Sequence, residues 1–449
     1  MKKTEDQRIT ILREEPPVSA VLKMGLPVAM GMLFMVAYNL VDTYFIGLLH
    51  DDYQLAAASL SYPVLMVMIA LSGIVGNGGA SYIARCMGAG KEEEAQRTLM
   101  HGFEMILAGG VLLLLAGVFL SGPLARVLGA RDETLAPTIQ YVRVILIGSV
   151  FTMGNYAFGQ LLRSEGSATL SMIGMILGTV ANMILDPLFI FTFGMEIRGA
   201  AIATVIGNAL STAFFLWIYM SGRSLLKPDL RLAGFSGRIM KEIMAVGTPH
   251  TLEQFLSTAS ILVLNNLAAA YGGLTVAAMG ISSKIMSFGN YIYQGITAGC
   301  QPLMGYNYGA KNYRRLRNVV RAGILVVTAA EILIMAAGAL AAPALIGLFS
   351  KNEEVIAIGK RTLRAAVLIL PFVGTTAMVR NLYNSIGKPM YAFLITVIRQ
   401  LVLYIPFLLL FNRLWGYGGL IHAQPAEEAL CLVVSAVLLR RTMNNLEQE

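Results

Sequence analysis

Two polar residues four positions apart interrupt a long apolar stretch, and their side chains could bind a cation. Asn182 and Asp186 lie in the run 168–193, and this spacing places both side chains on one face of a helix. Pro187 follows directly; because proline has no N–H, the carbonyl of Met183 loses its helical partner and is able to act as a further oxygen ligand. A carboxylate at the depth of a lipid bilayer is energetically unfavourable, so such residues usually mark a path for ions or substrates.

Other polar residues lie in neighbouring apolar runs. Asp42 occurs in the first run of the chain, and Thr204 is near the start of the run that follows Asp186. The alternative to an ion site is that Asn182 and Asp186 only hydrogen-bond an adjacent helix. An amide and a carboxylate beside a proline, with a second carboxylate in another run, favour a cation site inside a membrane.

The composition is that of a polytopic membrane protein. Of the 449 residues, 56% are hydrophobic and 13% are charged, about half the charged fraction of a soluble protein. Cys86, Cys300 and Cys431 are too widely spaced for a zinc motif or a disulfide framework. The first twenty residues lack the apolar core of a signal peptide, so none is expected. Because no nucleophile, cofactor or metal motif is found, we expect neither an enzyme nor a cofactor.

Apolar runs long enough to span a bilayer, which takes roughly twenty residues each, occur twelve times. They predict an all-α polytopic membrane protein with twelve transmembrane helices. The runs are 22–48, 59–84, 102–121, 138–162, 168–193, 199–221, 243–270, 275–306, 322–348, 362–386, 390–411 and 417–439.

The placement of basic residues predicts the orientation in the membrane. With the N-terminus in the cytoplasm, 22 of the 34 Lys and Arg residues fall in cytoplasmic segments and 8 in outside segments. Cytoplasmic loops are normally the richer in Lys and Arg, so we expect both termini in the cytoplasm. The same distribution explains the net charge of +8 without a nucleic-acid partner.

The chain contains an internal repeat at an offset of about 220 residues. Gly25-Leu26-Pro27 matches Gly247-Thr248-Pro249, and Asp186-Pro187-Leu188 matches Ile405-Pro406-Phe407. Six spans per half is an even number, so the halves have the same orientation and an axis along the membrane normal relates them. Such repeats are typical of secondary transporters. The predicted division is an N-lobe (1–221) with the cation site, a cytoplasmic linker (222–242) and a C-lobe (243–449).

The two halves differ where the chemistry lies. When the prolines are aligned, Asp186 matches Ile405 and Asn182 matches Leu401. The cation site therefore belongs to the N-terminal half alone. The C-terminal half instead carries Glu253, four residues after Pro249, and the pair Glu427-Glu428 in the last run. Because adjacent helical residues point apart, we expect at most one of this pair to line the C-lobe, and we take Glu427 as the candidate.

Several segments in order along the chain resemble the MATE family (multidrug and toxic compound extrusion), in its bacterial form. The resemblance covers essentially the whole chain, including its length, span count and duplication. The segments that carry it are Tyr38-Asn39-Leu40-Val41-Asp42-Thr43-Tyr44-Phe45-Ile46-Gly47, Gly88-Ala89-Gly90-Lys91, Asn182-x3-Asp186-Pro187, and Gln301-Pro302 through Tyr306-Asn307-Tyr308-Gly309-Ala310-Lys311-Asn312.

The resemblance implies two pseudo-symmetric six-helix lobes around a central V-shaped cavity, and export of drugs against an inward flow of Na⁺ or H⁺. Carried over by position, Asp42, Asn182, Asp186 and Thr204 would form the cation site. Two adjacent carboxylates either share a proton or bind a cation. All the ligands are hard oxygens, which suit Na⁺ and would equally accept H⁺. Tyr38, one turn before Asp42, either hydrogen-bonds it or packs.

Two further candidates for substrate binding or coupling depend partly on the resemblance. Glu253 matches an acidic position on the seventh helix that one branch of the family uses for cation coupling or a cationic substrate. That branch also has a carboxylate on the tenth helix, whereas the run 362–386 contains no acid and carries Arg380. Asn155, near the middle of the fourth run, either lines a substrate cavity or bonds to a neighbouring helix.

We therefore predict a multidrug exporter, an antiporter of amphipathic or cationic compounds that works by alternating access. It is expected to be a monomer in a bacterial inner membrane, with small drug-like substrates and surrounding lipid as its partners. The alternatives are a flippase of lipid-linked precursors, which would need several Arg residues for phosphates, and a dedicated exporter of one metabolite.

Overall fold

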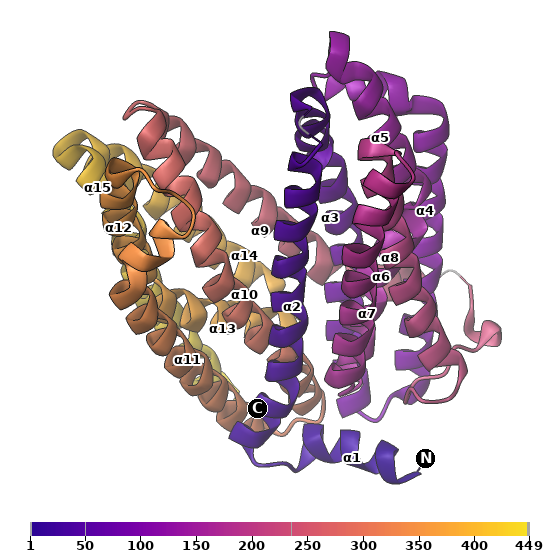
Figure 1. The fold of residues 1–449 in the computed structure, drawn as a ribbon. Coiled ribbons are helices and arrows are strands. Elements are labelled where there is room, and N and C mark those ends of the chain that lie inside the picture. Colours follow the sequence, from indigo (N-terminus) through magenta and orange to yellow (C-terminus); the bar gives the residue numbers. More distant parts are fainter. Residues whose placement is uncertain (1, 50, 235, 447–449) are drawn as a thin grey trace. The chain divides into compact units, whose positions relative to one another are not determined.

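The computed structural model describes residues 2–49, 51–234 and 236–446, and all regular structure in these ranges is helical (Figure 1). The first half forms α1 (Lys2–Arg13), α2 (Pro17–Gly47), α3 (Asp52–Gly88), α4 (Glu92–Val127), η1 (Asp132–Thr134), α5 (Leu135–Ile147), α6 (Ser149–Ser164), α7 (Ala168–Pro187), η2 (Leu188–Thr192) and α8 (Glu196–Met220). The second half forms η3 (Leu230–Leu232), α9 (Gly237–Ala269), α10 (Gly273–Gly309), α11 (Tyr313–Gly347), α12 (Glu353–Val367), α13 (Leu370–Ser385), α14 (Pro389–Val397), η4 (Ile398–Tyr404) and α15 (Ile405–Asn445).

These helices correspond to the twelve predicted runs. Within the described residues, seven segments are long and apolar enough to cross a membrane, and the bent pairs α5/α6 and α12/α13 raise the number to nine. The longest segment, Pro389–Asn445, contains two runs because Gly416 (φ 57°, ψ −138°) interrupts the helix. The helices α9 and α10 account for the remaining two runs. The predicted all-α class and twelve-helix, two-lobe layout are confirmed.

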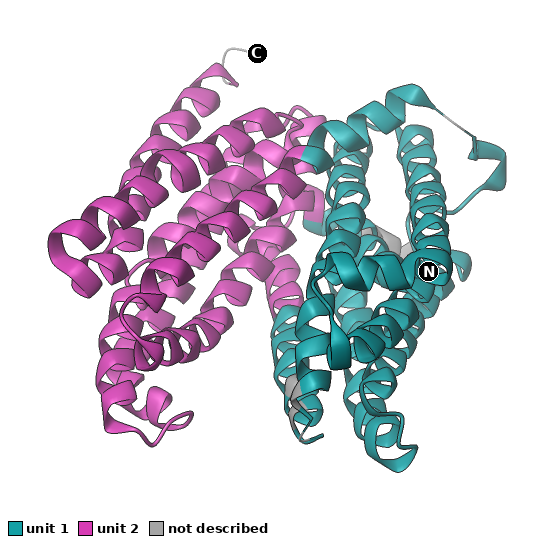
Figure 2. Ribbon diagram, turned by 90° about the horizontal axis from the view of Figure 1, so that it is seen from above, with its two compact units in different colours: residues 1–11, 30–248 teal, residues 12–29, 249–449 magenta. Residues whose placement is uncertain are grey.

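The described helices pack into two compact units (Figure 2). The first unit comprises residues 1–11 and 30–248, and the second comprises residues 12–29 and 249–449. In the first, α7 packs along α8, α3 on α6 and α4 on α5; in the second, α10 packs on α11, α12 and α13. The predicted division at 222–242 follows the sequence repeat, whereas in the folded chain that linker belongs to the first unit.

Each half of the repeat begins with a helical segment that packs in the unit of the other half. The start of α2 lies against α10 in the second unit, where a Cβ added at Gly299 would lie 2.5 Å from the backbone oxygen of Met24. The start of α9 lies against α3 in the first unit, where a Cβ at Gly247 would lie 2.2 Å from the backbone oxygen of Ile74. Only glycine permits approaches this close.

One buried carboxylate holds the first residues of the linker. Glu165 lies in the turn between α6 and α7 and is fully buried. Its Oε2 accepts hydrogen bonds from the Ser224 hydroxyl (2.5 Å) and from the backbone N–H groups of Leu225 (2.7 Å) and Leu226 (3.3 Å). Burial raises the pKa of Glu165 to about 7, although these three donors act in the opposite direction. The first residues of the linker are thereby held on the helices of the first unit.

Candidate functional site

Asp42 on α2 and Asp186 on α7 face each other in the first unit. The two carboxyl groups are close enough to interact electrostatically with each other. Asp186 is fully buried, and within the described residues neither of its oxygens, nor Oδ1 of Asp42, has a hydrogen-bond partner. A buried polar atom without a partner requires an explanation, and a bound ion or proton is one that fits here.

The other two predicted cation ligands lie beside this pair and are bonded to each other. The Asn182 amide nitrogen donates to the Thr204 hydroxyl (3.3 Å), and the hydroxyl of Tyr38 is 3.4 Å from the same Thr204 oxygen. Tyr38 is also close enough to Asp42 and Asp186 to interact with them electrostatically. The amide oxygen of Asn182 is buried without a partner among the described residues, so it remains available to a cation.

Close packing of α7 on α8 positions Asn182 beside Thr204. A Cβ added at Gly207 would lie 2.6 Å from the Gly178 backbone oxygen and 3.1 Å from Cβ of Asn182. The two helices can therefore approach only because these positions have no side chain. After Pro187, α7 continues as the π-helical turn η2, as expected where a proline removes a backbone donor.

Tyr141 belongs to this site and was not predicted from the sequence. It lies on α5, is 5% exposed, and interacts electrostatically with both Asp42 and Asp186. The only signal in the sequence is a phenol within the apolar run 138–162. Its helix is far from Asp42 and Asp186 along the chain, so spacing alone could not reveal the contact.

Asn155, predicted to contact substrate or a neighbouring helix, has an interhelical hydrogen bond. Its amide nitrogen on α6 donates to the Asn208 oxygen on α8 (2.8 Å), and the Asn208 nitrogen donates to the Thr152 hydroxyl (3.2 Å). The amide oxygen of Asn155 is buried without a partner among the described residues. Asn155 therefore bonds to a neighbouring helix, and its role in substrate binding stays a prediction.

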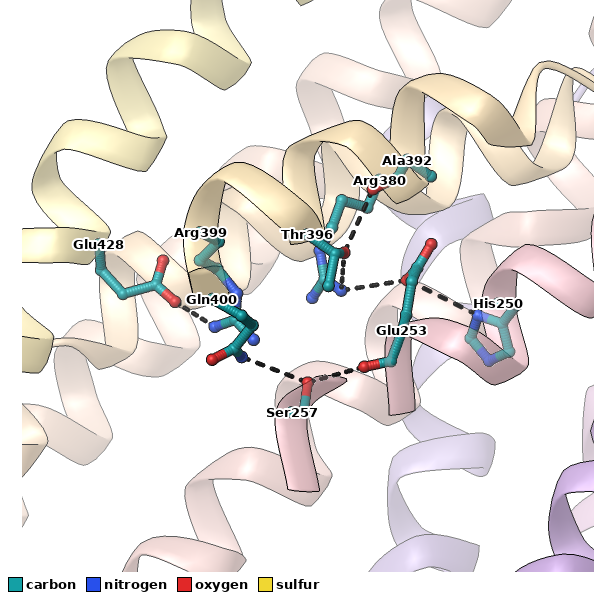
Figure 3. Close-up of polar contacts among 9 residues, drawn as sticks. All are labelled: His250, Glu253, Ser257, Arg380, Ala392, Thr396, Arg399, Gln400 and Glu428. Atoms are coloured by element: carbon teal, nitrogen blue, oxygen red, sulfur yellow. Dashed lines mark hydrogen bonds and ion pairs between the residues drawn. The ribbon is translucent and has the colours of Figure 1, made fainter. Parts of the chain in front are cut away.

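Glu253 in the second unit is paired with a cation of the protein itself (Figure 3). Its Oε2 accepts from the Arg380 guanidinium on α13 at 3.3 Å and lies 4.0 Å from Nδ1 of His250. Glu253 is 4% exposed. The tenth predicted span therefore carries an arginine in place of a carboxylate, and this arginine, Arg380, neutralises Glu253.

Glu427 and Glu428 are both buried, with exposures of 1% and 0%. The expectation that at most one would point inward was wrong, because their carboxyl groups converge: ligand oxygens of the two lie within 4.8 Å of each other. Arg399 on η4 forms an ion pair with Glu428 (Figure 3). The next residue, Gln400, donates to Ser257 (3.2 Å), which in turn donates to the Glu253 carbonyl (3.0 Å).

Comparison with known proteins supports the duplication and the resemblance. The MatE family model matches the chain twice, over residues 27–188 and 249–410, which agrees with the predicted offset of about 220 residues. The multidrug export protein MepA of Staphylococcus aureus (strain MSSA476) is 29% identical over 437 residues, which are 97% of this chain and 96% of that protein. MepA of Staphylococcus saprophyticus is 28% identical with the same coverage.

Solved structures match over nearly the full length. A MATE protein crystallised in complex with MaL6 superposes with a TM-score of 0.93 at 28% identity, covering 98% of this chain and 99% of that one. A MOP superfamily transporter from Pyrococcus furiosus, for which reverse polarity of the binding pocket suggests a different function, superposes with a TM-score of 0.91 at 28% identity, covering 98% of each chain. Since the family model covers more than half of the chain and these matches extend over almost all of it, the chain belongs to the MATE family of membrane transporters.

Proposed function

We propose that this protein is a cation-coupled multidrug exporter that exchanges amphipathic or cationic compounds for Na⁺ or H⁺ by alternating access. Asp42, Asn182, Asp186 and Thr204 bind the coupling ion. The match to MepA, a multidrug export protein, supports the substrate class. The arrangement of oxygen atoms in the first unit supports the assignment of the ion site.

The single observation that carries the proposal is the proximity of the Asp42 and Asp186 carboxyl groups, which interact electrostatically. Two carboxylates this close repel each other at low dielectric unless a proton or a cation lies between them. Among the described residues, no Lys or Arg is near enough to affect the charge of either Asp42 or Asp186. Ion binding therefore stabilises the approach of α2 to α7, and ion release favours their separation.

The position of Asp42 lets this change reach the second unit. Residues 12–29 belong to the second unit, whereas residue 30 onward, including Asp42, belongs to the first. A force on the later turns of α2 is thus transmitted along a continuous helix. One elementary charge moving down 100 mV supplies about 2.3 kcal/mol, which would support a roughly fifty-fold concentration ratio if one charge moved per drug.

The test is ethidium efflux from proteoliposomes under an imposed Na⁺ gradient or an imposed pH gradient. We expect one gradient to drive wild-type efflux and both Asp42→Asn and Asp186→Asn to abolish it while the protein remains folded. Glu93→Gln, which removes an exposed carboxylate on α4, is the matched control and should transport normally. Unchanged gradient-driven efflux in both aspartate variants would contradict the assignment of the ion site.

The rival functions make different predictions in the same assay. A flippase of lipid-linked precursors needs free guanidinium groups for phosphate, but Arg380 and Arg399 are each paired with a carboxylate. A dedicated exporter of one metabolite would move no ethidium under either gradient.

We place the protein as a monomer in the bacterial cytoplasmic membrane with both termini inside. Labelling of single cysteines introduced near each terminus would check on which side of the membrane the termini lie.

A further inference from the structure

The second unit contains a buried group of charges with one carboxylate in excess. Arg380 pairs with Glu253, and Arg399 pairs with Glu428, so two arginines neutralise two glutamates (Figure 3). Glu427, on the same helix as Glu428, is the remaining member of the group. It is 1% exposed, and its Oε1 is buried without a hydrogen-bond partner in the described part of the chain.

Among the described residues, none supplies Glu427 with a second positive charge. The charged groups that interact with Glu427 are Glu428, Arg399 and Arg380. Both arginines already form an ion pair with another glutamate. A buried charge without compensation is strongly unfavourable at this depth. The other described titratable groups that interact electrostatically with Glu427 are Tyr404 on η4 and Cys431 on the same helix as Glu427, and neither carries a positive charge.

We propose that Glu427 is a proton-binding site of the second unit, separate from the Asp42–Asp186 pair. The group formed by Arg399, Glu427 and Glu428 has one positive charge and two carboxyls, so electroneutrality requires one bound proton. A metal ion is a poor fit, because the Arg399 guanidinium already engages Glu428 and repels a second cation. A proton needs almost no space, so it can bind at the buried carboxyl of Glu427 without moving a neighbouring side chain.

The proton resides on Glu427 because Arg399 bonds to Glu428. One oxygen of each glutamate and the Cys431 sulfur lie within 4.8 Å of one another, so the two carboxyls compete for the same guanidinium. If Glu428 becomes neutral, Glu427 becomes the only available partner for Arg399 and loses its proton. Glu428 is therefore a positioning residue, which fixes where the proton is held.

This site adds one exchangeable proton to the transport cycle, whichever ion binds at Asp42 and Asp186. A Na⁺-coupled exporter would then show a dependence on pH that originates in the second unit. The inference does not require the first site to be the coupling site, because bound protons can be observed in the absence of transport.

The experiment is infrared difference spectroscopy of the full-length protein in lipid bilayers, in the region of protonated carboxyl groups. We expect the wild type to show a band that Glu427→Gln removes, and that shifts when water is replaced by heavy water. Glu428→Gln should remove the same band, because Glu427 then ionises beside Arg399. Glu354→Gln, which removes an exposed carboxylate on α12, should leave the spectrum unchanged.

Titration of wild-type protein provides a test that needs no variant. The band should disappear as the pH is raised, with release of one more proton than Glu427→Gln releases over the same range. The proposal is overturned if Glu427→Gln leaves the carboxyl region unchanged, or if the band survives in Glu428→Gln. A wild-type band that persists at the highest pH at which the protein stays folded would also overturn the proposal, since a carboxyl group that never loses its proton cannot exchange it.

Discussion

Gly178 on α7 and Gly207 on α8 meet backbone to backbone: a Cβ on either residue would lie 2.6 Å from the backbone oxygen of the other. This contact determines the separation of the two helices that carry Asn182, Asp186 and Thr204. The geometry of the proposed ion site therefore depends on two residues that contribute no ligand to it.

Gly178→Ala is expected to lower the stability of the protein. The added methyl group would meet the Ser211 hydroxyl at 2.0 Å as well as the Gly207 backbone, and overpacking of this kind costs about 1–3 kcal/mol. The measurement is thermal unfolding in detergent. Gly122→Ala on α4 is the control, because no atom lies within 4 Å of its Cβ position; equal melting temperatures for the two variants would contradict the prediction.

Thr204→Val is expected to weaken binding of the coupling ion while export remains. The change keeps the shape of the side chain and removes the hydroxyl that contacts Asn182 and Tyr38. Loss of one such interaction is worth ~1 kcal/mol, so the ion concentration that gives half-maximal efflux should rise about five-fold. Thr204→Ser retains the hydroxyl and should behave like the wild type. The role of Thr204 would be disproved by a Val variant with an unchanged ion requirement.

Glu253 and Arg380 should behave as one unit in a double-mutant cycle. Removing one member of a buried ion pair leaves an uncompensated charge and costs about 3–5 kcal/mol. Glu253→Gln and Arg380→Met should each destabilise the protein by about that amount, and the double variant by much less than the sum. Thermal unfolding of the four proteins measures the coupling. Additive effects would show that the 3.3 Å contact contributes nothing.

The attachment of the linker should depend on pH through Glu165. Its pKa is about 7 in the folded protein against 4.5 in an unfolded chain, so between these values only the folded protein keeps the proton. This group therefore stabilises the fold at low pH, and the contribution is lost as the pH rises through 7, by up to about 3 kcal/mol. We expect hydrogen exchange at Leu225 and Leu226 to accelerate over that range.

Glu165→Gln provides the matched control for the linker. The amide keeps an oxygen that can accept from Ser224, Leu225 and Leu226 and cannot ionise. Exchange of the linker amides in this variant should no longer change between about pH 5 and pH 8 beyond the intrinsic dependence of exchange on pH. If wild type and variant show the same profile, ionisation of Glu165 does not control the attachment of Leu225 and Leu226.

Local patterns in the sequence were sufficient for the fold and for the placement of part of the proposed ion site. Apolar runs identify helices because each span must satisfy its own backbone in lipid. The spacing of Asn182 and Asp186 places them on one helix face, and both are buried there. Asp42, as a second carboxylate in another apolar run, favours the same site, and the family resemblance places it there by position.

The contacts that were missed connect residues far apart in the chain. Glu253 and Arg380 each stand out in the sequence as charges within apolar runs, but 127 positions separate them. Helical periodicity relates residues on one helix and does not predict a pairing between two. Neighbouring side chains on an isolated helix point apart, which predicts that Glu427 and Glu428 diverge. In the folded protein both carboxyls turn inward, and Arg399 bonds to one of them. Tyr141 gave no signal beyond its own polarity.

The exchange of the first segments of α2 and α9 has a consequence for synthesis on the ribosome. The start of α2 is made early, but its packing partner α10 is made only after the linker. The start of α9 instead emerges when α3 is already in the membrane. The N-terminal half therefore cannot complete its own packing before the eighth span has been inserted. A chain that stops within the linker would leave Met24 and its neighbours facing lipid in place of the glycines of α10.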